Sequence, residues 1–102
     1  MPKSKYQIRF LTIAEEDLNE IASYIALDNP KAANALVTKI EENLLLLSEN
    51  SLLGRLPRDE EIRKLGFRYL VVRNFIIFYT VENKTFYIHR ILHGARNYKT
   101  VL

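Results

Sequence analysis

The sequence predicts an α+β domain in which a strand and an antiparallel helical hairpin precede a three-stranded antiparallel meander. Two successive segments carry apolar residues at helical spacing and are separated by an Asn-Pro pair. One alternating segment precedes them, and three segments rich in β-branched and aromatic residues follow, divided by short polar turns. At 102 residues, the chain is expected to form a single domain over 1–102, without internal repeats or linkers.

The first two elements follow each other closely. Residues 6–11, YQIRFL, alternate and are rich in strand formers, which predicts a strand. Apolar residues then recur at helical intervals, with acidic residues away from that stripe, which predicts a helix over 13–28. Thr12 precedes Glu15 by three positions. Because that is the spacing of a capping box, we expect these two side chains to cap the start of the helix.

A second helix is predicted to run from Pro30 to about residue 49. Pro30 suits the first helical position, and Asn29 before it is the expected cap. The short connection predicts that the two helices form an antiparallel hairpin. Four consecutive leucines, 44–47, make the end of this helix apolar nearly all round. Either the sheet and the following loop enclose this end, or another chain covers part of it. Leu45 and Leu46 are the candidates for such a contact.

The remainder of the chain is predicted to form a loop and a meander. Residues 50–60 form the loop, punctuated by Gly54 and Pro57. We expect three strands, over 62–72 with a bend at Gly66, 75–81 and 85–92, with turns at 73–74 and 82–84. Strict alternation in the last strand would place Phe86, Ile88, Arg90 and Leu92 on one face, and Tyr87, His89, Ile91 and His93 on the other.

Composition excludes several classes of protein. The absence of cysteine rules out a disulfide scaffold and thiol catalysis. No signal peptide or apolar run of membrane-spanning length is present, so we expect a soluble cytoplasmic protein without a membrane partner. His89 and His93 would lie about 13 Å apart along a strand, too far to share a metal ion. Without a glycine-rich phosphate loop or a nucleophile elbow, we expect neither a metal nor a cofactor.

Charge is distributed unevenly along the chain. Residues 13–54 carry eight acidic and two basic side chains, whereas residues 55–73 and 84–102 have net charges of +3 and +4. A basic second half predicts contact with a polyanion or an acidic partner, the alternative being ordinary solvated charge. The candidate target-binding residues are Arg63, Lys64, Arg73, Arg90 and Lys99.

Four residues form a candidate catalytic set. His93 could act as base or acid, Tyr98 as acid, and Arg68 and Arg96 could stabilise developing phosphorane charge, as metal-free cleavage of RNA requires. Gly94 would end the last strand and allow Arg96 and Tyr98 to fold back toward His93 and Arg68. Arg68 lies among apolar neighbours, so its charge needs a partner, which could be an internal carboxylate or carbonyl as readily as a phosphate.

The segments "AEEDLNEIASYIALDNPKAANAL", "LGRLPRDEEIRKLGFRYLV", "FIIFYTV" and "YIHRILHGAR" occur in an order that resembles the RelE/ParE superfamily of bacterial toxins. The resemblance covers residues 6 to about 98 and implies the toxin half of a type II toxin–antitoxin module. It also implies a small, acidic, partly disordered antitoxin as partner, for which Leu45 and Leu46 are the candidate contacts. RelE-like members cut messenger RNA in the ribosome, whereas ParE-like members poison DNA gyrase.

The helical hairpin and the "RILHGAR" ending look closer to the ParE side, so we expect a gyrase poison, with a RelE-type endoribonuclease as the alternative. "GFR" and "GAR" resemble the superfamily motifs that would give Arg68 and Arg96 catalytic roles. Tyr98 is near the position of the terminal tyrosine of the ribonucleases. Arg63 and Lys64 are the nearest counterparts of the lysine pair of the RelE-like enzymes, which this chain does not reproduce.

Overall fold

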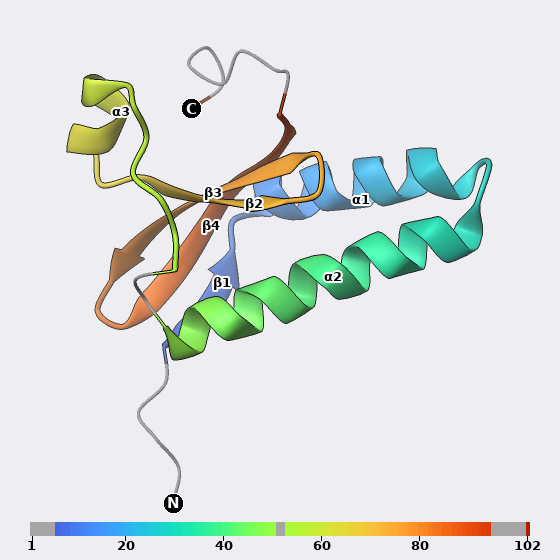
Figure 1. The fold of residues 1–102 in the computed structure, drawn as a ribbon, viewed down its shortest axis with the longest axis horizontal. Coiled ribbons are helices and arrows are strands. Elements are labelled where there is room, and N and C mark those ends of the chain that lie inside the picture. The colour runs from blue at the N-terminus through green and yellow to red at the C-terminus, as the bar shows by residue number, and fades with distance from the viewer. Residues whose placement is uncertain (1–5, 51–52, 95–101) are drawn as a thin grey trace, which may run out of the picture.

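The computed structural model describes residues 6–50, 53–94 and 102, and it confirms the predicted α+β fold. Helices α1 and α2 run side by side as a hairpin along one side of a four-stranded sheet, and the short helix α3 lies away from them (Figure 1). In chain order the elements are β1 (Gln7–Phe10), α1 (Thr12–Ala26), α2 (Pro30–Glu49), α3 (Glu60–Lys64), β2 (Arg68–Val72), β3 (Phe75–Glu82) and β4 (Thr85–His93).

The sheet has the strand order β1-β4-β3-β2. The meander is antiparallel, whereas β1 lies parallel to β4, which places the first strand beside the last. Two-residue turns join the strands of the meander. Asn83 and Lys84 have φ of 51° and 59°, the left-handed pair that a type I′ hairpin turn requires. Arg73, in the β2–β3 turn, has φ of 56°.

The two long helices begin differently. Asn29 caps α2 as predicted, since its Oδ1 accepts a hydrogen bond from the amide of Ala32 at 3.1 Å. The capping box predicted for α1 is wrong: Leu11 is the N-cap, and no side chain caps the helix. The physical reason is the one-residue connection, because Leu11 still donates its amide to the Ile88 carbonyl at 3.0 Å. Thr12 is therefore already the first helical residue.

The predicted strand over 62–72 is wrong in its first half, which forms α3. Asp59 caps this helix, accepting a hydrogen bond from the Ile62 amide at 3.0 Å. Acidic residues occupy its first turn and basic residues its last, the distribution that the helix dipole favours. Gly66 follows with φ of 92°, a left-handed conformation that ends the helix. Consequently β2 begins only at Arg68.

The predicted alternation of β4 is wrong beyond Ile88. Tyr79 pairs with Ile88 and Phe78 with Arg90, so His89 is an extra residue in β4, a β-bulge. The extra residue reverses the faces that follow it. Ile91 therefore packs in the same core as Phe86 and Ile88, and Leu92 packs on the opposite side, whereas strict alternation placed Leu92 with Ile88.

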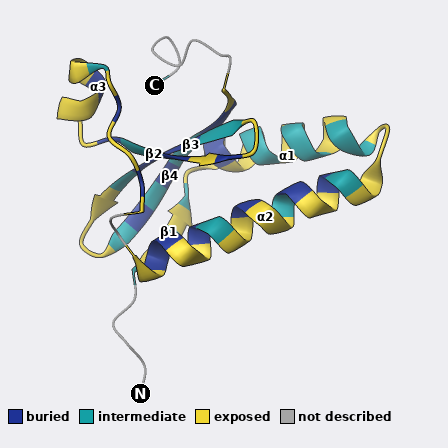
Figure 2. Cartoon of the chain, in the orientation of Figure 1, coloured by how far each residue is buried: buried dark blue, intermediate teal, exposed yellow. Residues whose placement is uncertain are grey.

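Two hydrophobic clusters flank the sheet. The main core joins the sheet to α1 and α2, and the smaller cluster joins Ile62 of α3 to the other face through Phe67, Phe78 and Leu92. Figure 2 shows the alternation of buried and exposed residues along α2. Among the described residues, no helix is long and apolar enough to cross a membrane. The buried residues of the main core are Ala14, Leu36, Ile40, Leu44, Leu47, Leu70, Val72, Ile77, Tyr79, Phe86, Ile88 and Ile91.

The four-leucine run divides between core and surface. Leu44 and Leu47 are buried, whereas Leu45 and Leu46 remain 58% and 54% exposed. The sheet and loop therefore do not enclose this end of α2 completely. The two residues predicted to contact a partner are accessible for that contact.

Candidate functional site

Arg90, a predicted target-binding residue, lies in an internal ion pair. Its Nε and Nη2 donate to the two carboxylate oxygens of Asp17 on α1, at 2.8 and 3.0 Å. Asp17 also accepts the Ile91 amide at 3.0 Å. Because β1 pairs with β4 only as far as Ile88, Asp17 binds the strand edge that β1 leaves open. The hydrogen bond to Asp17 raises the pKa of Arg90, and burial opposes that rise.

Arg68 opens β2 and reaches back to the preceding loop. Its Nη1 donates to the carbonyl of Gly54 at 3.3 Å, so the carbonyl alternative for this arginine is the one observed. Gly54 also packs against the hydroxyl of Tyr79, and a Cβ at this position would collide with it. The Tyr79 hydroxyl is buried, and among the described residues it has no partner with hydrogen-bond geometry. Burial raises its pKa, while the Arg68 charge and the Gly54 backbone oppose that rise.

Arg63 and Lys64 lie on α3, where their side chains hold local structure. Arg63 Nη1 donates to the carbonyl oxygens of Pro57 and Arg58, at 2.8 and 3.3 Å. Lys64 forms an exposed ion pair with Glu60, 3.8 Å between Nζ and Oε2. These two predicted contact residues therefore tie α3 to itself and to the loop before it.

His93 and Arg68 lie at opposite ends of the meander. Arg68 is in register with Tyr79, which is in register with Ile88. His93 is in register with Phe75, four residues from Tyr79 along β3, which separates the two rows by roughly 13 Å. It is exposed, with its ring edge-on to Phe75 at 5.7 Å between centroids. The structure does not bring these two predicted catalytic residues together. The other predicted residues of the C-terminal segment lie outside the described part of the chain: Arg96, Tyr98 and Lys99.

The bulged residue His89 is half-buried, and sequence reasoning assigned it no role. Its Nε2 lies 2.9 Å from the Thr80 hydroxyl, and its ring packs edge-on against Phe67 at 4.8 Å. Burial lowers the pKa of His89, which keeps the imidazole neutral at pH 7. The bulge that directs it to this position has no signal in the sequence.

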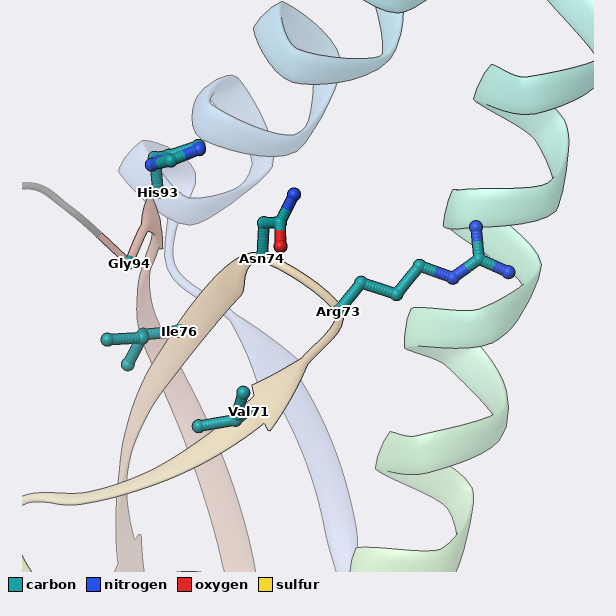
Figure 3. Close-up of a pocket in the computed structure, with 6 residues that line it drawn as sticks. All are labelled: Val71, Arg73, Asn74, Ile76, His93 and Gly94. Carbon is teal, nitrogen blue, oxygen red and sulfur yellow. The ribbon is translucent and has the colours of Figure 1, made fainter.

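The end of the meander that carries His93 forms an open pocket of about 310 Å³ (Figure 3). Val71 and Ile76 supply apolar side chains that extend toward the same side. The polar part of the lining comes from His93 and from Arg73 and Asn74 of the β2–β3 turn. The turn is held to the end of β4, since the amide of residue 94 donates to the Asn74 carbonyl at 2.8 Å.

This pocket brings together two predicted residues, Arg73 and His93, but not a catalytic set. Val71 and Ile76 make part of its lining apolar, whereas the Arg73 side chain extends away from these two residues (Figure 3). The described lining residues include no carboxylate. Such a lining suits the binding of an apolar side chain better than proton transfer. Within the described residues there is also no group of three potential metal ligands.

A second hollow is lined by carboxylates. It has a volume of about 380 Å³ and lies where the end of β1 meets the helical hairpin. Phe10 and Leu18 give it an apolar lining, and Glu15 and Glu41 give it negative charge.

Comparison with known proteins agrees with this architecture. Residues 8–98 match the family model described as the ParE toxin of the type II toxin–antitoxin system parDE. A similar solved structure, a chromosomal ParDE toxin–antitoxin system from P. aeruginosa, has 25% identity and a TM-score of 0.69, covering 86% of this chain and 95% of that one.

The fold is also similar to that of one chain of the RelBE2 toxin–antitoxin complex from Mycobacterium tuberculosis, at 24% identity and a TM-score of 0.60, covering 88% of this chain and 99% of that one. No curated protein matches the sequence significantly. Since the family model spans nearly the whole chain, this protein belongs to the ParE toxin family of type II toxin–antitoxin systems.

Proposed function

We propose that this toxin arrests growth by poisoning DNA gyrase, without acting as a nuclease. The match to the ParE family supports this target, because the ParE-like side of the superfamily acts on gyrase. The observation that carries the proposal from the geometry is the separation of Arg68 from His93. Arg68 is bound to the Gly54 carbonyl, and it lies roughly 13 Å along the sheet from the row of His93.

The proposal treats the basic end of the sheet as a protein-binding surface. Asn74 and His93 are exposed and line the same pocket as the apolar side chains of Val71 and Ile76, a combination typical of protein interfaces. Binding would then depend on the summed contacts of this surface rather than on one indispensable side chain.

We also propose that a cognate antitoxin neutralises the protein. The two similar solved structures are of a ParDE toxin–antitoxin system and a RelBE2 toxin–antitoxin complex. Exposed Leu45 and Leu46 provide apolar surface on α2. An acidic, partly disordered antitoxin would fold on binding and cover that surface and the basic end of the sheet. A gyrase or messenger RNA target would place the toxin in the cytoplasm.

Induction in cells tests this proposal against the alternative, a ribosome-dependent messenger RNA endoribonuclease. We expect an early DNA damage response with double-strand breaks while messages remain intact. Co-expression of the neighbouring small acidic open reading frame should restore growth. The wild-type protein is compared with the Arg68→Ala and Arg96→Ala variants in the same experiment. If messenger RNA is cleaved at defined codon positions, and both variants abolish this cleavage, the gyrase proposal is overturned and the endoribonuclease is established.

A further inference from the structure

The outer edge of β2 has one section that the described chain does not pair. Val72 and Phe75 flank a two-residue turn, so they form a hydrogen-bonded pair. Leu70 and Ile77, two residues further along each strand, form the next hydrogen-bonded pair. The amides and carbonyls of the alternate residues, Tyr69 and Val71, therefore point away from β3.

The bridge to Arg55 verifies this direction. The Arg55 amide donates to the Tyr69 carbonyl at 2.8 Å, and the Tyr69 amide donates to the Arg55 carbonyl at 2.9 Å. Val71, two residues on, presents its amide and carbonyl to the same side. Within the described residues, the bridge to this edge ends at Tyr69.

Val71 also borders the pocket at the end of the meander. Its side chain is 46% exposed and lies with Ile76 in the lining of the 310 Å³ hollow. A strand added beside Val71 would direct every second side chain to this face of the sheet. One apolar side chain of that strand would then reach the surface that Val71 and Ile76 provide.

Charge specifies what kind of segment this edge accepts. Residues 65–81, which include all of β2, contain two arginines and no acidic residue. Exposed Arg55 and Arg73 stand on either side of the unpaired section. A second copy of β2 would bring two basic edges together without a compensating carboxylate, which disfavours self-association here. An extended segment with alternating acidic and apolar residues complements both the charge and the pocket.

We propose that an extended, acidic segment of the antitoxin pairs with Val71 as a fifth strand next to β2 and places an apolar side chain in the Val71–Ile76 pocket. This inference rests on the proposed antitoxin partner and specifies how that partner binds. The main-chain bonds to Val71 give affinity, and the pocket and the two arginines give specificity.

The decisive variant is Val71→Pro, which removes the outward-pointing amide while leaving the hydrogen bonds of Leu70 and Val72 to β3 in place. Val81→Pro is the matched control. Val81 is 40% exposed, and its amide also points away from β4, because Glu82 and Thr85 flank the type I′ turn. It lies beyond the end of β2, outside the proposed contact.

The probe is the purified protein from the neighbouring small acidic open reading frame, titrated onto refolded toxin with circular dichroism as the check of folding. We expect Val71→Pro to weaken binding about tenfold or more, and Val81→Pro to change it less than about twofold. In the unmodified complex, hydrogen exchange of the Val71 amide should slow relative to free toxin. This second measurement needs no variant, so it holds even if proline disturbs the fold.

Unchanged binding by a folded Val71→Pro variant, or a Val71 amide that exchanges equally fast in the complex, would overturn the strand addition. If the proteins bind and growth is rescued, such a result leaves the toxin assignment standing. Absence of any binding would overturn the inference together with the antitoxin proposal. The gyrase proposal is then judged separately by growth arrest and DNA breaks.

Discussion

Replacing Asp17 with alanine should destabilise the protein far more than an ordinary helix substitution. Asp17 and Arg90 are only 12% and 14% exposed, and the carboxylate accepts two hydrogen bonds from the guanidinium and one from the Ile91 amide. The variant leaves the Arg90 charge and the Ile91 amide without that partner. Breaking a buried pair on one side costs about 3–5 kcal/mol.

We expect the free energy of unfolding to fall by about 3–4 kcal/mol, a large part of the roughly 5–15 kcal/mol of a small domain. Urea unfolding followed by circular dichroism measures it, and the midpoint should drop by about 1.5–3 M. Glu16→Ala, on the exposed side of the same helix, is the control and should change stability little. A loss below about 1 kcal/mol for Asp17→Ala would refute the reasoning, because it would show that the pair is no better than a surface salt bridge.

Three further changes test other parts of the structure. Gly54→Ala should lower stability by about 2 kcal/mol or more in thermal unfolding, because the new methyl group collides with both the hydroxyl and the ring of Tyr79; a variant as stable as the wild type would contradict this close approach. Gly66→Ala should cost about 1–2 kcal/mol because of the left-handed φ of 92°, and an unchanged melting temperature would contradict this. Burial lowers the pKa of His89 in the folded protein, so as the pH falls the unfolded chain binds a proton before the folded one does. The contribution of His89 to the free energy of unfolding should therefore be fully present above about pH 6.5 and decline as the pH falls below it. His89→Gln should flatten that decline, and an NMR titration of His89 at or above the ordinary histidine pKa would contradict the sign.

Local signals predicted the local elements well. Both long helices follow from apolar periodicity, and Asn29 before Pro30 marks the start of α2 because a cap depends on adjacent residues alone. The sequence also contains signals for the helix α3. Asp59, the acidic first turn and the basic last turn are ordinary helix signals, but five residues are too few for periodicity to outweigh the neighbouring strand pattern.

Features that depend on distant contacts were not predictable. The Asp17–Arg90 pair joins residues 73 positions apart, and its formation depends on the parallel pairing of β1 with only part of β4. The bulge at His89 is set by the register of two strands rather than by a residue type, so a strict alternation missed it. For the same reason, the sequence did not show that Arg68 and His93 belong to separate rows of the meander.

The most direct test of the central claim uses purified DNA gyrase, relaxed plasmid and ATP, with the refolded toxin added at increasing concentration. The account predicts loss of supercoiling and accumulation of cleaved plasmid, both prevented when the toxin is first mixed with its antitoxin. Arg68→Ala should retain most of this effect if it stays folded, because the arginine is bound to the Gly54 carbonyl. Full supercoiling activity at toxin concentrations that arrest growth in cells, together with cleaved messages, would contradict the account.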